Sequence, residues 1–83
     1  MITVIQLREE LKNQGFNIKV TEKTIIIGPS SNIESIEVVS IFGVIEEMAG
    51  EQGIELNLFE LLLSDHTKDT NLKEIVDKAN SNF

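Results

Sequence analysis

Ser35 carries a hydroxyl close to the expected start of the strongest helix of the sequence. It follows turn-forming residues at 28–32 (Gly-Pro-Ser-Ser-Asn) and opens a long acidic segment, with Glu34 and Glu37 beside it. The first N–H groups of a helix lack partners and the helix dipole is positive there, so a negatively charged group at this position would be stabilised. The alternative is that Ser35 only caps the helix, which is the commonest use of serine at such a position.

Few other residues offer catalytic or metal-binding chemistry. Cysteine is absent, which rules out disulfides, thiolate metal sites and cysteine nucleophiles. His66 is the only histidine, so a multi-histidine zinc site is excluded, and we expect this residue to lie in a loop. The acidic residues fit no EF-hand spacing, and no glycine-rich phosphate loop is present. We therefore expect no catalytic residue and no metal; a hydrolase using Ser35 with His66 as base is the least favoured alternative.

The acidic residues are concentrated in the middle of the chain. The formal net charge is −7, and no Lys or Arg lies between Lys23 and Lys68. A segment with one sign of charge repels nucleic acid and anionic membranes and attracts basic protein surfaces. We therefore expect protein partners with basic docking surfaces, no nucleic acid and no membrane, although an ordinary solvated acidic surface would have the same composition. The acidic residues of this interval are Glu34, Glu37, Glu46, Glu47, Glu51, Glu55, Glu60 and Asp65.

The length of 83 residues predicts one domain, spanning residues 1–83. A domain of this size has little interior for a deep catalytic pocket, which favours a binding or carrier module over a self-sufficient enzyme. The first residues show no basic stretch followed by an apolar run, and no apolar run approaches the roughly 20 residues that span a bilayer. We therefore expect a cytoplasmic protein.

Helical signals dominate the sequence. Residues 3–13 read as a helix with Thr3 as its cap, Gln6 at capping-box spacing and Gly15 as its stop. The strongest helix spans 33–52, a short apolar helix is expected at 58–63, and a last helix begins at Asp69 or Thr70. This pattern predicts an all-α bundle of three main helices and one short helix, with a long first connection.

Residues 16–27 are ambiguous. Phe16, Ile18 and Val20 alternate with polar residues and are followed by a β-branched run, which predicts a short β-hairpin turning at 21–23. The alternative is a long ordered loop whose apolar residues plug the base of the helical bundle.

Two apolar residues of the 33–52 helix do not belong to its core stripe. At 100° per residue, Ile36 and Val39 lie among the polar positions beside Ser35. β-branched residues on a wet helix face gain no burial and lower the helix propensity. They therefore predict either a docking patch, or a loop that folds back over them.

The segment from Ile33 to Glu47 resembles the signature of acyl carrier proteins, in which Asp-Ser-Leu opens an acidic amphipathic helix that ends in Leu-Glu-Glu. Residues 20–24 with Gly28, residues 53–56 and residues 70–77 are similar to the segments that precede and follow this helix in the family. The resemblance covers nearly the whole chain in order. Glu34 and Ile36 replace the family's Asp and Leu. Fewer of the residues that usually form the family's partner-docking face are present in this sequence.

The resemblance implies a non-catalytic, monomeric carrier. Ser35 would bear 4'-phosphopantetheine and hold acyl or aminoacyl groups as thioesters for fatty-acid, polyketide or related biosynthesis. A phosphopantetheinyl transferase and acyl-loading or acyl-transferring enzymes would be its partners. The alternative is a carrier-like adaptor without the prosthetic group. The residues that the resemblance assigns to partner binding are Glu34 and Glu37 beside the serine, Ile36 and Val39 as an apolar centre, and Glu46 and Glu47 as an acidic rim.

Overall fold

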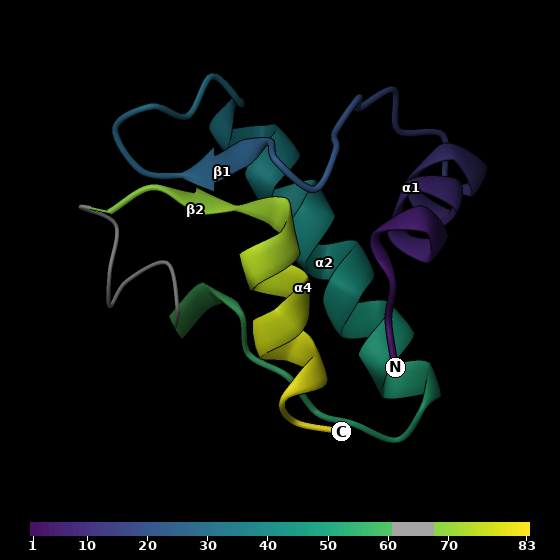
Figure 1. Cartoon of the computed structure of the whole chain (residues 1–83). Helices are drawn as coiled ribbons and strands as arrows, with labels where there is room; N and C mark the ends of the chain where they lie inside the picture. The colour runs from purple at the N-terminus through teal and green to yellow at the C-terminus, as the bar shows by residue number, and fades with distance from the viewer. Residues whose placement is uncertain (61–67) are drawn as a thin grey trace.

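Three helices and a two-stranded antiparallel sheet make up the part of the chain, residues 1–60 and 68–83, that the computed structural model describes (Figure 1). The prediction of three main helices is confirmed. The prediction of an all-α fold is only partly right, because a small sheet is present. In chain order the elements are α1 (Val4–Asn13), β1 (Ile25–Ile27), α2 (Ser35–Glu51), β2 (Thr70–Asn71) and α4 (Leu72–Asn80).

The ends of α1 follow the sequence signals. Thr3 Oγ1 accepts a hydrogen bond from Gln6 N at 3.1 Å, and Gln6 Oε1 accepts one from Thr3 N at 3.1 Å, which completes the expected capping box. Gly15, just beyond the helix, has a φ of 87°, a conformation that favours glycine.

The start of α4 differs from its prediction. Asn71, and neither Asp69 nor Thr70, is the N-cap, and its Oδ1 accepts a hydrogen bond from Glu74 N at 2.9 Å. Thr70 belongs to β2, where it pairs with Ile27. The helix therefore begins later than expected because the preceding residues are held by the sheet.

The hairpin predicted at 16–27 does not form, and the alternative of an ordered loop holds only for residues 16–24, because residues 25–27 form the strand β1. β1 pairs with β2, which lies near the other end of the chain, in the register Ile25↔Asn71 and Ile27↔Thr70. The loop before β1 also holds the start of α4, because Leu72 N donates to the Thr24 carbonyl at 2.9 Å. Apolar residues of this segment enter the core, since Val20 is buried.

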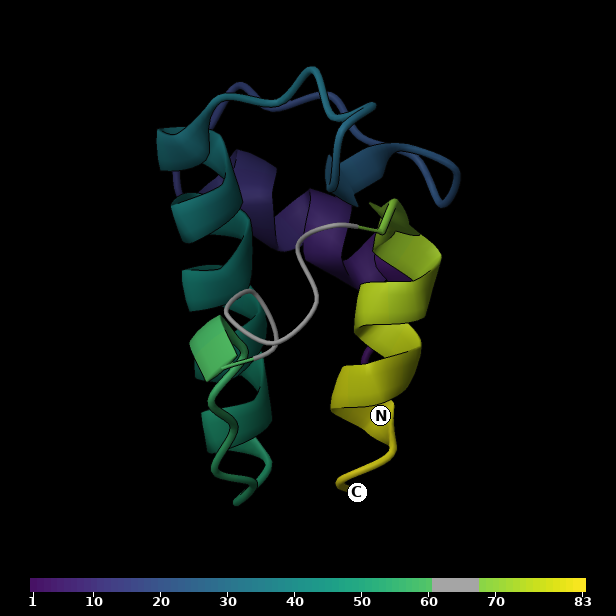
Figure 2. The ribbon, with the colours of Figure 1, turned by 90° about the vertical axis from the view of Figure 1, so that its left-hand side faces the viewer.

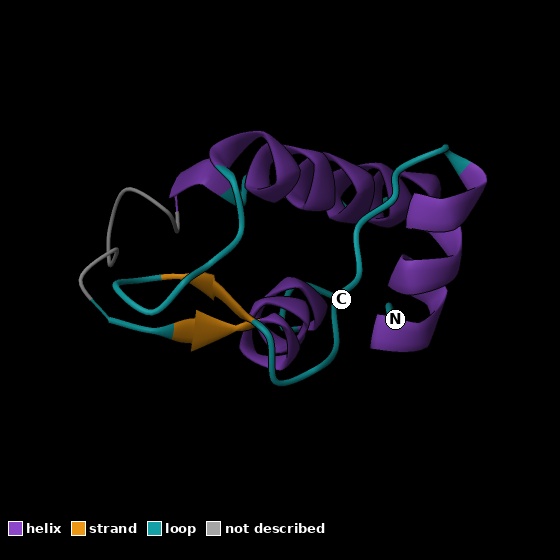
Figure 3. Ribbon diagram, turned by 90° about the horizontal axis from the view of Figure 1, so that it is seen from above, coloured by secondary structure: helices purple, strands orange, loops and turns teal. Residues whose placement is uncertain are grey.

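The core lies where the three helices meet. Figure 2 shows α2 and α4 side by side with α1 crossing behind them, and the connections before α2 lie over one end of the bundle. Figure 3 shows the sheet on the opposite side of α4 from α1. None of the helices in the described part of the chain has the length and apolar character needed to cross a membrane. The inward residues of the helices are Val4, Leu7 and Leu11; Val38, Ile41, Phe42, Val44, Ile45 and Ala49; and Leu72, Ile75, Val76 and Ala79.

Hydrogen bonds join the two ends of the chain at the end of the bundle that lies away from the connections before α2. Asn80 accepts from Ile2 N through Oδ1 and donates from Nδ2 to the Ile2 carbonyl, both at 2.8 Å. Ile2 is buried, so these bonds close the core beneath α1.

Half of the predicted short helix at 58–63 lies within the described residues. Leu58 is a turn residue and Phe59 and Glu60 are helical, whereas positions 61–63 lie outside the described residues. The loop prediction for His66 also lies outside the described residues.

Candidate functional site

Ser35 is the first residue of α2, and Glu34 is the N-cap. Ser35 therefore does not cap the helix, which was the alternative explanation for a serine at this position. Its side chain is exposed, and within residues 1–60 and 68–83 its hydroxyl forms no hydrogen bond. The result is an accessible hydroxyl on the first turn of a 17-residue helix.

The turn before α2 is anchored to β1 and to Asp69, the residue that precedes β2. Ser31 N donates to the Gly28 carbonyl at 3.1 Å, and Ser31 Oγ donates to the Ile26 carbonyl at 3.0 Å. Ser30 N donates to Asp69 Oδ1 at 3.1 Å, which ties the turn to the residue before β2. Gly28 has a φ of 118° and packs directly on the Asp69 backbone. These contacts fix the position from which α2 starts.

The acidic residues beside Ser35 have different environments. Glu34 is exposed, whereas Glu37 is half-buried and its Oε1 accepts a hydrogen bond from Glu34 N at 3.3 Å. The Glu34 carbonyl accepts from Glu37 N at 2.9 Å and from Val38 N at 3.1 Å. The earlier N–H groups, those of Ser35 and Ile36, lie at the positive end of the helix dipole. The helix dipole would stabilise an anion on Ser35, and repulsion by the two carboxylates would offset part of this stabilisation.

An apolar groove of about 320 Å³ opens beside Ser35, between β1, the start of α2 and Phe59. The Phe59 ring packs edge-on against Phe42 of the core, with ring centroids 5.7 Å apart. The sequence pattern does not reveal this groove, because it predicts a hairpin for residues 24–27 and a short helix for Phe59, and neither prediction brings these residues beside the start of α2. The groove is lined by Ser35 itself and by Ile26, Ile27, Ile33, Val38, Val39 and Phe59.

Ile36 and Val39 lie on the surface. Their exposed fractions are 72% and 50%, so none of the described loops folds back over them and that alternative is wrong. Val39 also lines the groove, whereas Ile36 faces outward one helical position beyond Ser35. Exposed β-branched side chains beside an accessible hydroxyl form a small apolar patch that another molecule could cover.

The structure separates Glu46 and Glu47. Glu46 is half-buried, and its Oε1 accepts a hydrogen bond from Leu58 N at 3.3 Å. Glu47 is exposed, and its Oε2 accepts one from Gln14 Nε2 at 3.3 Å. At a rise of 1.5 Å per residue, Glu46 lies about 16 Å along the helix from Ser35. Both carboxylates are therefore far from the hydroxyl, and Glu46 also holds the segment that carries Phe59.

Comparisons with protein-family models, with curated proteins and with solved structures find no match to this chain. The resemblance to acyl carrier proteins therefore rests on the sequence pattern alone. The structure adds the positions of the residues that carry the pattern.

Proposed function

We propose that this protein is a carrier whose Ser35 bears a phosphopantetheine arm and holds acyl or aminoacyl groups for biosynthetic enzymes. The observation that carries the proposal is the exposed hydroxyl of Ser35 on the first turn of the acidic helix α2, beside an apolar groove. Three helices with a long first connection are also the architecture that the resemblance leads us to expect. The proposal includes a cytoplasmic location.

The residues at the start of α2 fit such an arm. Its attachment would form a bond between Ser35 Oγ and the phosphorus of the pantetheine-bearing phosphate, and would break the bond to the adenosine bisphosphate part of coenzyme A. The serine proton would leave to a base of the transferase, because within the described residues no side chain bonds to Ser35. The phosphodiester would lie at the positive end of α2. When attached, the arm supplies a thiol, which this cysteine-free chain lacks.

The groove beside Ser35 suits an apolar group carried near the hydroxyl. Its side chains are mainly isoleucine and valine, and Phe59 forms one wall. Burying apolar surface there would contribute roughly 25 cal/mol for each Å² removed from water. A volume of about 320 Å³ suits a short acyl chain better than a long one. The groove could therefore shield part of the carried group from water.

The surface around Ser35 suits brief contacts with basic partner proteins. Ile36 and Val39 supply a small apolar centre, and Glu34 supplies an exposed charge beside the hydroxyl. Small patches with charged surroundings favour fast, salt-sensitive association over tight binding. A carrier needs this property because it must leave each enzyme after transfer.

Intact mass tests the proposal. The full chain would be incubated with coenzyme A and a phosphopantetheinyl transferase of broad substrate range. We expect the mass to increase by one phosphopantetheine, with the added group located on Ser35 by fragmentation, and no increase for Ser35→Ala. No increase in the native protein, or an unchanged increase in the variant, would overturn the proposal.

The adaptor alternative is supported by the same exposed Ile36 and Val39, which could bind a partner without any covalent group. It predicts an unmodified Ser35 and a partner complex that tolerates Ser35→Ala. The mass measurement therefore separates the two functions.

A further inference from the structure

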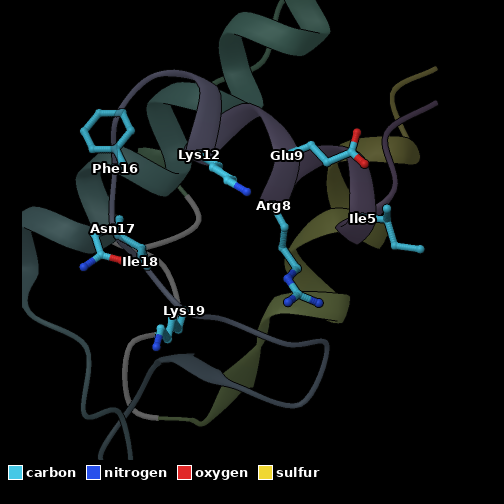
Figure 4. A pocket seen from close by; sticks show the side chains of 8 residues that line it. All are labelled: Ile5, Arg8, Glu9, Lys12, Phe16, Asn17, Ile18 and Lys19. Carbon is cyan, nitrogen blue, oxygen red and sulfur yellow. The ribbon is translucent and has the colours of Figure 1, made fainter.

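A second groove lies on the outer face of α1 and the segment that follows it. Its volume is about 440 Å³, larger than that of the groove beside Ser35. Figure 4 shows its side chains, which come from α1 on one side and from residues 16–19 on the other. The residues that give this α1 groove its character are Ile5, Arg8, Lys12, Phe16, Ile18 and Lys19.

The α1 groove is basic on a protein that is otherwise acidic. Arg8, Lys12 and Lys19 are three of the seven basic residues of the chain, and Glu9 is the one acidic residue of its lining. Arg8 and Lys12 are four residues apart and therefore share a helix face. Cations gathered on one face of a chain with a net charge of −7 create a local field opposite in sign to that of the whole.

Arg8, Lys12 and Lys19 are all exposed, and within residues 1–60 and 68–83 they form no ion pair. In the same part of the chain, the ion pair found is that of Lys73 with Asp77 at 2.9 Å, and its hydrogen bond raises the pKa of Lys73. The three cations of the α1 groove can therefore interact with the carboxylates of another molecule.

Apolar side chains interrupt the basic surface. Ile5 is 69% exposed and Phe16 is 37% exposed, and Ile18 is half-buried and packs against the core. Ile5 lies three residues before Arg8 and seven before Lys12, so the three share one stripe along α1. Apolar anchors flanked by charges are the usual composition of a protein-binding patch.

We propose that the α1 groove is a second docking site, which binds an acidic amphipathic helix of a partner protein. The apolar face of that helix would cover Ile5 and Phe16, and its carboxylates would pair with Arg8, Lys12 and Lys19. Charge complementarity selects this occupant. A nucleic acid would offer phosphates to the three cations but no aliphatic face to cover Ile5, and its longer run of phosphates would extend over the acidic remainder of the chain.

A second copy of the chain is the less suitable occupant. Its acidic α2 could face the α1 groove, but that contact would cover α2 together with the patch beside Ser35. A separate partner helix leaves α2 accessible, so the carrier could bind an acidic protein and a basic enzyme at the same time.

A peptide titration tests the α1 groove. The probe is a synthetic helix of four turns (about 14 residues) with leucines on one face and glutamates beside them, added to the ¹⁵N-labelled full chain. We expect amide shifts confined to α1 and residues 14–19, and weaker binding as salt increases. We expect the double variant Arg8→Glu/Lys12→Glu to bind about tenfold more weakly, and Arg8→Gln/Lys12→Gln to show a smaller loss.

The controls separate this site from general charge effects and from the proposed carrier function. Lys23→Glu makes the same type of charge change outside the groove and should alter binding less than about twofold. Ser35→Ala should leave the titration unchanged, since the α1 groove does not include it. The proposal is overturned if the shifts fall on α2, if Lys23→Glu weakens binding as strongly as the groove variants, or if a lysine version of the peptide or a single-stranded oligonucleotide binds equally well. Self-association of the chain through α1 without peptide binding would also overturn it.

Discussion

The patch at the start of α2 and the α1 groove are built from similar apolar residues but opposite charges. Ile36 on α2 and Ile5 on α1 are almost equally exposed, at 72% and 69%. The α2 patch combines its isoleucine with carboxylates and an exposed hydroxyl, whereas the α1 groove combines its isoleucine with Arg8 and Lys12. Equal apolar exposure therefore does not distinguish the two regions, and charge decides which partner each can accept.

The two regions also differ in how the backbone is anchored. The turn before α2 is bonded to β1 and to Asp69, which lie elsewhere in the chain. The backbone after α1 is bonded to its own helix, since Gly15 N donates to the Lys12 carbonyl at 3.0 Å and Phe16 N to the Leu11 carbonyl at 2.9 Å. The position of Ser35 therefore depends on long-range contacts, whereas the start of the segment after α1 depends on local ones.

The largest effect is expected from Gly28→Ala, compared with Gly15→Ala. Both glycines have positive φ, but a methyl group at Gly28 would lie 2.6 Å from Asp69 Cα, whereas at Gly15 it would meet open space among the described residues. We expect Gly28→Ala to lower the free energy of unfolding by about 3 kcal/mol or more, and Gly15→Ala by about 1 kcal/mol. Urea denaturation of both variants measures this. Equal losses would show that the turn before α2 is not held as described.

The second largest effect is expected from Ile36→Asp on the rate of arm attachment, with Ile5→Asp as the matched control. We expect Ile36→Asp to lower kcat/KM for arm attachment about tenfold, or ~1.4 kcal/mol, because it removes the apolar centre of the α2 patch. Ile5→Asp should leave kcat/KM unchanged and weaken the acidic peptide at the α1 groove. Both side chains are exposed, so neither variant should change the melting temperature by much. If both variants lowered kcat/KM for arm attachment equally, the α2 patch and the α1 groove would not have the separate roles proposed for them.

A smaller effect is expected from Glu46→Ala. Loss of the acceptor for Leu58 N should lower the free energy of unfolding by about 1 kcal/mol, whereas Glu46→Gln keeps an acceptor oxygen and should cost less. Thermal unfolding of the pair measures the difference. If both variants keep native stability and both slow arm attachment, Glu46 acts as a docking charge and not as a support for the segment of Phe59.

The smallest effect is expected from Ser35→Ala on stability. The side chain is exposed and Glu34 is the N-cap, so the free energy of unfolding should change by less than about 0.5 kcal/mol. Urea denaturation checks this directly. A loss near 1 kcal/mol or above would mean that the hydroxyl has a structural role in α2.

Local signals in the sequence predicted the helices well. The capping box of Thr3 and Gln6 indicated the start of α1, and the apolar period indicated α2 with Ile36 and Val39 outside its core stripe. Long-range pairing was not predictable in the same way. Residues 25–27 are β-branched as a strand should be, but their partner at 70–71 shows no strand pattern of its own.

The sequence predicts the serine of the candidate site but not the groove beside it. The helical period placed Ser35, Ile36 and Val39 on one face, which follows from helix geometry alone. The groove depends on β1 and Phe59 meeting α2, and no local pattern contains that contact. The α1 groove does have a local signal, because Ile5, Arg8 and Lys12 share a stripe that lies beside the core residues of their helix.

The absence of cysteine allows the central claim to be tested by counting thiols. After treatment with transferase and coenzyme A and removal of the excess, any thiol on the purified chain belongs to an attached arm. Ser40→Ala is the matched control, because Ser40 lies on the same helix and its Oγ already donates to the Ile36 carbonyl at 2.9 Å. We predict one thiol per chain for the native protein and for Ser40→Ala, and none for Ser35→Ala. A native protein without a thiol, or a Ser35→Ala variant that keeps one, would contradict the account.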